Sequence, residues 1–428
     1  MKARDMRDLL IVLTFGLLLA VAPAPAPAQT FTVLHTFHNG KGPRIPSGAL
    51  TLDGKGNLYG VAQGGEGICF SGTYPCGTVF KMTNTGTLDW VYSFPGPGAD
   101  GYTPTAGLLL VDGYLVGVTE YGGVNTKACS DNYSRICGVV FALDPTTRTE
   151  IVVHRFTDNP DGEIPESLLV DSTGSLYGTA LWGGIGNGIV FKLDRQGHET
   201  ILYTFQGLND GGDVYAGVIT DPQGNLYGTA DGGALGGGVV YELDSGGTET
   251  VLYNFTGYAD GSSPSWEAPL VRDSAGNLYG TTQYGGNQID ICDGNEGCGV
   301  VFKLSPNPGG IWVDTTLYQF CVQSECADGH RPLGGLILDT AGSLYGTTIF
   351  GGSNTCGAEG EGCGVVFKVN ASGAETILHA FTAGSDGAYP EGRLVMDASG
   401  NLYGTTTNGG DLTCNPPYGC GVVFEITP

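Results

Sequence analysis

Short apolar runs separated by tight polar turns recur along the whole chain and predict β-strands. Four such runs make up one clear copy of the pattern, at residues 268–273, 277–282, 299–304 and 314–320. The first turn begins with Asp273 and contains Gly276, the residue types that a tight hairpin connection requires. These strands are apolar on both sides, which is typical of sheets packed face to face. Each copy is therefore predicted to be a four-stranded blade.

A repeated phrase, Leu-Tyr-Gly, marks the second strand of each copy and gives the number of blades. A degenerate seventh copy reads Leu115-Val116-Gly117. The six full copies begin at Leu58, Leu176, Leu226, Leu278, Leu344 and Leu402. Repeats of roughly 50 to 65 residues built from short strands indicate a propeller or a solenoid. The sequence predicts an all-β fold, a seven-bladed β-propeller.

The two ends of the chain predict how the ring closes. The last copy has a third strand at residues 421–426 and then stops, whereas residues 31–37 match the fourth-strand pattern of other copies, such as residues 249–255. We therefore expect the N-terminal strand to complete the last blade, because closure removes the exposed edges that an open array would carry. Residues 29–428 are predicted to form this one propeller domain.

The first 28 residues have the features of a secretory signal peptide. Lys2, Arg4 and Arg7 precede the apolar run 9–22, and Ala26-Pro27-Ala28 provides a small-residue cleavage site before Gln29. The run is short for a bilayer span, so we expect no membrane association after signal removal. The sequence predicts a secreted or periplasmic protein.

The net charge of the chain argues against two classes of binding partner. The chain has 43 Asp and Glu against 18 Lys and Arg, for a formal net charge of −25. Such a surface repels phosphate backbones and anionic lipids, so neither nucleic acid nor membrane is expected as a partner. Solubility outside the cell also explains this negative charge. Separately, we expect the protein to be a monomer.

All 12 cysteines fall into six close pairs, and none shows the Cys-x-x-Cys spacing of zinc or redox motifs. An exported chain meets an oxidising environment, so we expect disulfides and no metal. The predicted pairs are Cys69/Cys76, Cys129/Cys137, Cys292/Cys298, Cys321/Cys326, Cys356/Cys363 and Cys414/Cys420. Five lie between second and third strands, and the sixth follows a fourth strand. They therefore pin loops on one face of the ring, where binding residues usually lie.

Crossovers from one blade to the next carry an Asp-Gly, in most copies followed by Pro. The acidic positions are Asp100, Asp161, Asp210, Asp260, Asp328 and Asp386. Because the crossovers lead into the innermost strands, these carboxylates are predicted to ring the channel mouth and to bind a cation or a polyhydroxylated ligand. The alternative is that each Asp only forms its turn by accepting backbone N–H bonds.

A second set of candidates precedes a Gly-Gly at the end of the second strand. Aromatic residues occupy four copies, Tyr121, Trp182, Tyr284 and Phe350, and the others have Gln63, Asp231 and Asn408. Flat aromatic faces on a rim suit sugar rings or apolar protein groups. Packing between blades explains these residues equally.

Motifs for catalysis or cofactor binding are lacking. His198-Glu199 has no second His at the zinc-protease spacing, and Pro97 lies inside the one run that matches the dinucleotide fingerprint. No nucleophile elbow or phosphate loop occurs, so no cofactor is expected. A carboxylate pair that cleaves a glycosidic bond remains an alternative, because the distance between the two carboxylates is determined by the fold and cannot be read from the sequence.

The run Asp-x-x-Gly-Asn-Leu-Tyr-Gly-Thr-Thr, with Gly-Val-Val-Phe-Lys-Leu and Glu-Thr-x-Leu-Tyr-x-Phe, resembles the GloVer tandem-repeat family of exported bacterial "choice-of-anchor" proteins. Residues 273–282, 299–304 and 249–255 carry the match. The resemblance implies the repeat fold and no particular activity. A looser similarity to NHL-type propellers implies the same strand order.

Two functions follow as hypotheses. The first is an exported binding module for a carbohydrate or an extracellular protein on the disulfide-pinned face. The alternative is a secreted polysaccharide hydrolase or lyase that acts through carboxylates at the channel mouth. A purely structural surface protein is a third class.

Overall fold

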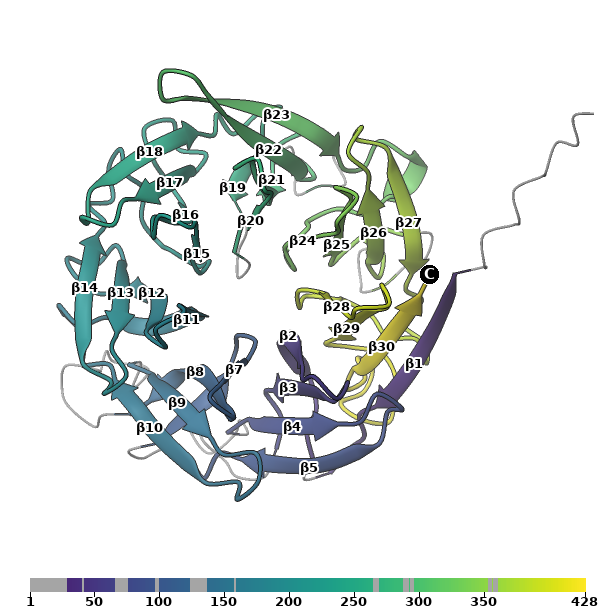
Figure 1. The fold of residues 1–428 in the computed structure, drawn as a ribbon. Coiled ribbons are helices and arrows are strands. Elements are labelled where there is room, and N and C mark those ends of the chain that lie inside the picture. Colours follow the sequence, from purple (N-terminus) through teal and green to yellow (C-terminus); the bar gives the residue numbers. More distant parts are fainter. Residues whose placement is uncertain are drawn as a thin grey trace, which may run out of the picture.

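A computed structural model describes residues 29–40, 42–65, 76–96, 100–123, 137–157, 159–264, 269–287, 292, 296–352, 356 and 361–428. The predicted signal peptide lies outside these ranges. Seven antiparallel sheets stand around a central axis, with their innermost strands facing that axis (Figure 1). The predicted seven-bladed β-propeller is confirmed. The described residues contain no helix with the length and apolar character that a membrane crossing requires.

The first three blades follow one another from the N-terminal side, and in each the strands run from the axis outward. Blade 1 comprises β2 (Pro46–Leu52), β3 (Leu58–Ala62), β4 (Thr78–Met82) and β5 (Leu88–Ser93). Blade 2 comprises β6 (Gly101–Pro104) and β7 (Leu109–Val111), both paired with β8 (Tyr114–Gly122), then β9 (Val139–Leu143) and β10 (Glu150–Arg155). Blade 3 comprises β11 (Glu163–Val170), β12 (Leu176–Trp182), β13 (Ile189–Leu193) and β14 (Glu199–Thr204).

The remaining blades keep this order. Blade 4 comprises β15 (Ile219–Thr220), β16 (Leu226–Ala230), β17 (Val239–Leu243) and β18 (Glu249–Asn254). Blade 5 comprises β19 (Ser262–Pro264) and β20 (Val271–Arg272), both paired with β21 (Leu278–Tyr284), then β22 (Val300–Asn307) and β23 (Ile311–Gln319). Blade 6 comprises β24 (Ile337–Leu338), β25 (Leu344–Thr348), β26 (Val365–Val369) and β27 (Glu375–Ala380), and a 3-10 turn, η3 (Ser324–Cys326), precedes it. Blade 7 comprises β28 (Val395–Met396), β29 (Leu402–Thr406), β30 (Val422–Thr427) and β1 (Thr30–Thr36).

The N-terminal strand closes the ring as predicted. β1 pairs antiparallel with β30, with Phe31 opposite Ile426 and Thr36 opposite Val422. Figure 1 shows the purple β1 lying along the yellow β30. The two ends of the described chain therefore share one sheet, and neither blade 7 nor blade 1 is left with an open side.

Contacts around the first turn explain the repeated phrase. In blade 5, Asp273 accepts backbone N–H bonds from Ala275 and Asn277 at 2.9 Å, and the hydroxyl of Tyr279 donates to its other oxygen at 3.0 Å. Gly280 follows because the ring of Phe302 lies only 2.6 Å from where a Cβ would stand. The same Tyr-to-Asp bond recurs in blades 1, 3, 4, 6 and 7. The Asp and Tyr of the repeated phrase thus stabilise the hairpin, and its Gly leaves space for the aromatic ring of the third strand.

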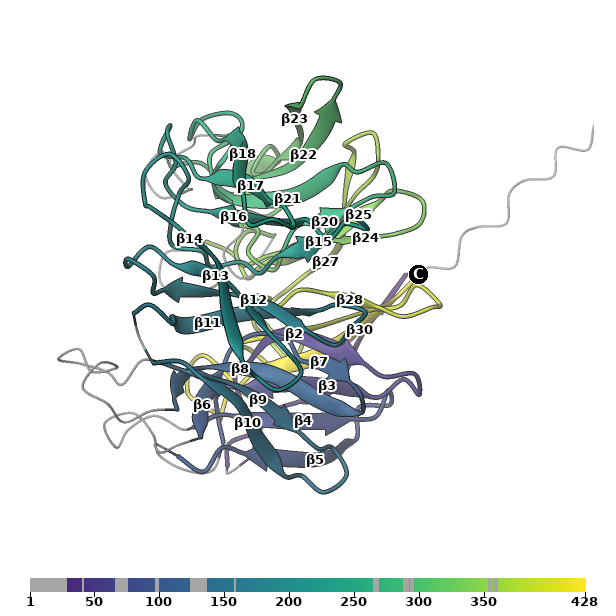
Figure 2. The same ribbon diagram turned by 60° about the vertical axis from the view of Figure 1, so that its left-hand side comes forward.

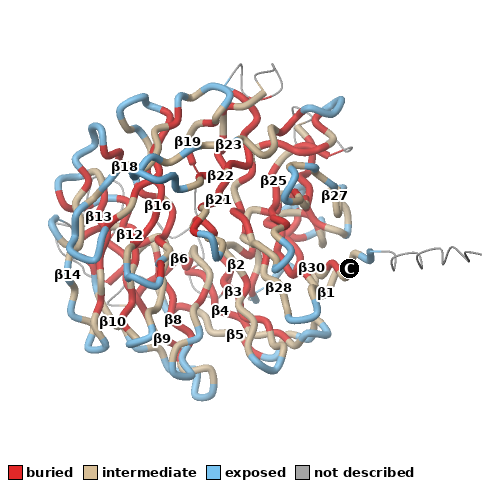
Figure 3. Tube along the Cα trace, turned by 45° about the horizontal axis from the view of Figure 1, so that its top comes forward, coloured by how far each residue is buried: buried red, intermediate tan, exposed pale blue. Residues whose placement is uncertain are grey.

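Aromatic pairs between adjacent blades form the core. The Phe that follows each fourth strand packs against an aromatic side chain in the third strand of the next blade, at centroid distances of 5.0 to 5.4 Å and large interplanar angles. The seven pairs are Phe37/Phe80, Phe94/Phe141, Phe156/Phe191, Phe205/Tyr241, Phe255/Phe302, Phe320/Phe367 and Phe381/Phe424. Edge-to-face geometry is favourable for aromatic rings. Buried residues accordingly run through the blades, whereas exposed ones gather at turns (Figure 3).

Tyr241 is the exception among these aromatic side chains, because its hydroxyl is buried without a hydrogen-bond partner among the described residues. We expect Tyr241→Phe to raise the free energy of unfolding by about 1 kcal/mol, since it removes an unsatisfied polar group and keeps the ring. Urea denaturation measures the change. Tyr203→Phe is the matched control and should lose stability, because its hydroxyl donates to Asp210 at 2.9 Å. Destabilisation by Tyr241→Phe would contradict this account.

Outer strands run along the circumference rather than parallel to the axis (Figure 1). Each pair of third and fourth strands contains a register shift, for example between Val190 and Phe191 in blade 3. Such bulges increase strand twist. As a result, each outer strand ends close to the start of the next one. The β22–β23 hairpin of blade 5 is longer than its counterparts, with eight paired positions, and extends away from the ring (Figure 2).

Candidate functional site at the channel mouth

Innermost strands of all seven blades line a central channel of about 760 Å³. Its walls are largely apolar, with residues such as Leu109, Leu169 and Ile337. Among the described residues, four charged side chains also line it, and they are Glu166, Arg272, Glu391 and Arg393. Burial raises the pKa of Glu391 to about 7. Arg393 donates from Nε to the carbonyl of Leu336 at 3.0 Å.

Seven residues with left-handed backbone stand where the crossovers enter the channel. Each lies within the first three residues of an inner strand or up to six residues before one, and their φ angles lie between 48° and 58°. They are Ile45, Thr103, Ile164, Asp213, Ser263, Arg331 and Tyr389. Non-glycine residues adopt this conformation at a cost, and it persists only where the surrounding structure enforces it.

One hydrogen bond per blade enforces this geometry. The N–H of each left-handed residue donates to the carbonyl that precedes the third strand of the previous blade, as Arg331 does to Cys298 at 3.0 Å and Tyr389 to Cys363 at 3.0 Å. In five of the seven copies, the acceptor belongs to the second cysteine of a predicted pair. Loops between second and third strands and the crossovers therefore share one face, which confirms the predicted loop face.

Two sets of residues form a ring that we call the rim. The first set is the seven left-handed residues, and the second set is the residues at the ends of the second strands, which alternate with them. This second set is Gln63, Tyr121, Trp182, Asp231, Tyr284, Phe350 and Asn408. Most pair through the backbone with the residue just before a left-handed one, as in Tyr102↔Tyr121, Glu163↔Trp182 and His330↔Phe350. The four aromatic residues singled out from the sequence thus occupy equivalent backbone positions on the loop face, one per blade.

A continuous aromatic arc spans blades 5 to 7. The guanidinium of Arg331 lies over the ring of Tyr284 at 5.2 Å and over that of Phe350 at 5.5 Å. Its Nη2 donates to the Tyr284 hydroxyl at 3.3 Å. Tyr389 meets Phe350 edge-on at 5.7 Å. Packing between blades, the alternative interpretation of the aromatic positions, therefore accounts for part of this arc.

Trp182 is the most exposed of the four aromatic rim residues. Its side chain is 39% exposed and borders a hollow of about 290 Å³ together with Asn159, Glu163 and Ile185. An open indole face beside a carboxylate and an amide offers stacking and hydrogen bonding in one place. This hollow has the chemistry of a small polar-ligand subsite.

Acidic groups occupy the rim between the two aromatic regions. Asp231 has a pKa raised to about 6, chiefly because it is buried and also because Asp213 lies nearby, and a hydrogen bond with Ser263 partly offsets the rise. Tyr121 stacks on Tyr102 at 5.5 Å and packs with Ile164, Leu181 and Tyr215. The rim is therefore chemically different from blade to blade while its backbone is uniform.

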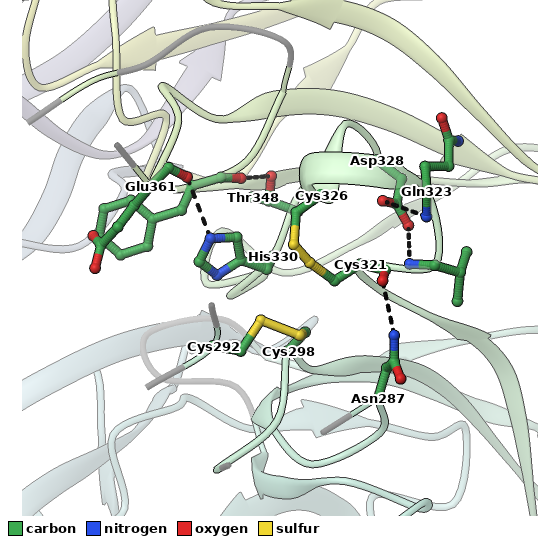
Figure 4. Close-up of a disulfide and its surroundings, with 12 residues drawn as sticks. Asn287, Cys292, Cys298, Cys321, Gln323, Cys326, Asp328, His330, Thr348 and Glu361 are labelled. Atoms are coloured by element: carbon green, nitrogen blue, oxygen red, sulfur yellow. Dashed lines mark hydrogen bonds between the residues drawn. A yellow bond between two sulfur atoms is a disulfide. The ribbon is translucent and has the colours of Figure 1, made fainter. Parts of the chain in front are cut away.

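Disulfides hold the loops beneath the rim. The pairs Cys292–Cys298, Cys321–Cys326, Cys356–Cys363 and Cys414–Cys420 form as predicted. Cys76 and Cys137 are also disulfide-bonded, and their predicted partners, Cys69 and Cys129, lie outside the described residues. Figure 4 shows two bridges side by side next to His330, whose Nε2 lies 3.3 Å from the carbonyl of Glu361. Burial lowers the pKa of His330 to about 4, so it is neutral near pH 7.

The predicted placement of the crossover carboxylates at the channel mouth is wrong. Their partners belong to outer strands: Asp210 accepts from the Tyr203 hydroxyl and from two loop N–H groups, and Asp328 does the same with Tyr318. Asp161, Asp260 and Asp386 bond to His154, Tyr253 and His379, and Asp100 faces Glu150. None of the six lines the channel. A crossover starts at the circumference and reaches the axis only several residues later.

Taken together, the fold and the rim define a closed β-propeller that displays variable side chains on a uniform circular scaffold. A profile of the Gloeobacter/Verrucomicrobia repeat matches residues 126–358 and 293–428. The chain belongs to this repeat family, which confirms the resemblance drawn from its motifs. No curated protein sequence matches the chain.

Several solved structures resemble the fold. An oligogalacturonate lyase from Vibrio parahaemolyticus aligns over 93% of this chain and 96% of its own, with a TM-score of 0.51 and 12% identity. A gluconolactonase from Xanthomonas campestris (68% of this chain, 78% of its own) and TolB from Acinetobacter baumannii (72% and 60%) both reach 14% identity, with TM-scores of 0.40 and 0.39. At these identities the likeness concerns the fold alone.

Proposed function

We propose that this chain is an exported binding module whose rim holds a carbohydrate. The observation that carries the proposal is the Trp182 hollow, where an exposed indole stands beside Glu163 and Asn159 on the loop face. Sugar rings present apolar C–H faces that stack on aromatic rings and hydroxyls that bond to carboxylates and amides. The arc of Tyr284, Arg331 and Tyr389 extends the same rim and would contact further sugar units.

Binding to a panel of immobilised glycans tests this proposal. Trp182→Ala is expected to weaken the Kd for the retained glycan at least about tenfold, because a partly exposed aromatic anchor is lost. Arg331→Ala should weaken binding of longer glycans more than of short ones. Tyr114→Ala is the matched control, since this residue is 38% exposed at the opposite end of its blade. Equal effects of Trp182→Ala and Tyr114→Ala, or no retained glycan, would refute the carbohydrate proposal.

Cleavage of a polysaccharide is the second candidate, and one observation favours it. Glu391 lines the channel beneath the rim, and burial raises its pKa to about 7, the range in which a carboxylic acid can donate a proton near neutral pH. Glu166 lines the same channel from β11. Products of the glycans incubated with the protein distinguish the two functions. Shortened chains that disappear with Glu391→Gln would favour cleavage, and intact glycans favour binding alone.

A further inference from the structure

Carboxyl groups meet in pairs at the joints between successive outer strands. One member of each pair is the crossover Asp that follows a fourth strand. The other is an acidic residue of the fourth strand of the next blade, which begins that strand in four blades and is Asp314, at the same register within β23, in blade 5. Five joints have this arrangement, with the Tyr or His of the first strand beside it: Tyr92/Asp100/Glu150, His154/Asp161/Glu199, Tyr203/Asp210/Glu249, Tyr253/Asp260/Asp314 and Tyr318/Asp328/Glu375.

Each strand carboxyl in these pairs has one oxygen that is buried without a hydrogen-bond partner in the described part of the chain. The five atoms are Oε1 of Glu150, Glu199, Glu249 and Glu375 and Oδ1 of Asp314. A buried acceptor facing another carboxylate is costly unless something neutralises it. Because all five joints repeat the same feature, an accident of one side chain does not explain it.

Hydrogen bonds distinguish the two members of the blade 3–4 pair. Asp210 accepts the Tyr203 hydroxyl at 2.9 Å and the N–H groups of Gln206 and Leu208 at 2.8 and 3.3 Å. These donors stabilise its carboxylate. Glu249 has no such donors among the described residues, and its pKa rises to about 7 because it is buried and because Asp210 is nearby. Burial and Asp328 also raise the pKa of Glu375 to about 7, although Nε2 of Gln323 donates to Oε2 of this residue at 3.4 Å.

The two joints that involve the closing strand β1 have no such carboxyl pair among the described residues. Phe31 stands where the strand carboxyl would be and stacks on His379 at 3.6 Å, while His379 bonds to Asp386 at 3.1 Å. At the following joint, Leu88 takes that place opposite His35 in the repeat. The five carboxyl pairs are therefore confined to joints within the continuous chain.

We propose that a proton shared between the two carboxyls of each pair stabilises the outer circumference of the propeller, so that the fold is most stable in mild acid and becomes less stable toward neutral and alkaline pH. The O–H of the strand carboxyl donates to the crossover carboxylate and removes the repulsion between them. A proton fits better than a metal ion, because a Tyr or His at each joint already hydrogen-bonds to one carboxyl of the pair, which is the crossover Asp at four joints and Glu150 at the first. The ligand atoms of His154, Asp161 and Glu199 do lie within 4.8 Å of one another, so the test includes metals.

The sign of the pH dependence follows from the strand carboxyls. A group with a raised pKa in the folded state stabilises the fold at low pH and loses that effect as pH rises through its folded value. Glu249 and Glu375 therefore lose their contribution between their ordinary pKa of 4.5 and about pH 7, and Glu199, whose pKa rises to about 9, loses it later. In that window, each pair raises the unfolding constant by up to about tenfold per pH unit.

Proton release on unfolding gives the decisive measurement. Urea unfolding of the wild type is followed from pH 5 to pH 8 and compared with Glu249→Gln/Glu375→Gln, whose amides donate to the same Asp at every pH. We expect the double variant to release about two fewer protons near pH 6 and to be the more stable protein at pH 8. Glu325→Gln, on an exposed turn, is the control and should follow the wild type.

Two further readouts keep the test independent of variant folding. In the folded wild type at pH 6, infrared spectra should show the C=O stretch of protonated carboxyls, reduced in the double variant. A wild type whose stability is unchanged from pH 5 to pH 8, or a double variant with the wild-type slope, would overturn the proposal. Saturable stabilisation at pH 8 by calcium or zinc, reversed by EDTA and lost in the double variant, would also overturn it and assign the pairs to a cation.

Discussion

Removal of residues 29–37 is expected to abolish the cooperative unfolding transition of the propeller. β1 supplies the whole outer strand of blade 7 and pairs with β30 over its length. Phe31 packs on Phe424 at 5.5 Å, and Phe37 packs on Phe80 of blade 1 at 5.4 Å. The deletion therefore removes a sheet strand and an inter-blade contact together, a loss comparable with the total stability of about 5–15 kcal/mol that is typical of a folded domain.

Near-ultraviolet circular dichroism and limited proteolysis report this loss. A chain that begins at Gln29 is the control, because it keeps β1 intact and lacks only the predicted signal peptide. We expect the control to melt in one sharp transition and the shorter chain to show weak tertiary signal and rapid cleavage. Closure by β1 would be contradicted if both chains melted in one transition at the same temperature.

Phe302→Ala is expected to lower the free energy of unfolding by about 3–5 kcal/mol, the range for a fully buried aromatic truncated to Ala. The Phe302 ring is 0% exposed, lies 5.0 Å from Phe255 of blade 4, and covers Gly280. Its removal leaves a cavity at the boundary between two blades. Blades bury their cores only against one another, so the loss reaches beyond a single sheet.

Chemical denaturation of Phe302→Ala beside Tyr258→Ala measures this effect. Tyr258 is 68% exposed, and its truncation should change stability by no more than about 0.5 kcal/mol. Similar losses in the two variants would mean that the aromatic pairs between blades do not dominate the core.

Much of the fold was predictable because each residue type in the repeat has one local structural role. The Asp of the first turn, the Tyr that bonds to it and the Gly beneath Phe302 all lie within one hairpin, so their spacing is visible in the sequence. Closure was predictable because residues 31–37 match a strand that the last copy lacks. Both inferences depend on contacts that the repeat itself encodes.

Placement of the crossover carboxylates failed for a geometric reason. The prediction treated each crossover as part of the innermost strand, whereas its first residues remain at the circumference beside the strand they leave. A sequence signal for the correct partner existed: Tyr203 and Asp210 are seven residues apart, as are Tyr253 and Asp260, and His379 and Asp386. An acidic residue at or near the start of five outer strands also recurs in the repeat, but its partner is in another blade.

The left-handed residues of the rim had one signal in the sequence, because all except Asp213 directly precede a Pro, but that signal does not predict their backbone conformation. Positive φ is usually read from Gly or Asn, yet Ile45, Thr103 and Arg331 adopt it in this ring because a hydrogen bond to the neighbouring blade holds the backbone. The assembled ring reveals the hydrogen bond that gives these positions the same backbone conformation. The aromatic candidates were found because they share a fixed distance from Gly-Gly.

Equivalent backbone at seven positions frees side-chain choice from folding. Ile, Thr, Asp, Ser, Arg and Tyr already occupy the same left-handed place, each held by the same carbonyl acceptor. Selection, natural or in the laboratory, can therefore exchange side chains at these positions and keep the backbone, provided that the packing of Ile164, Arg331 and Tyr389 against their neighbours is preserved. A library randomised at these seven positions would be a compact source of new receptors.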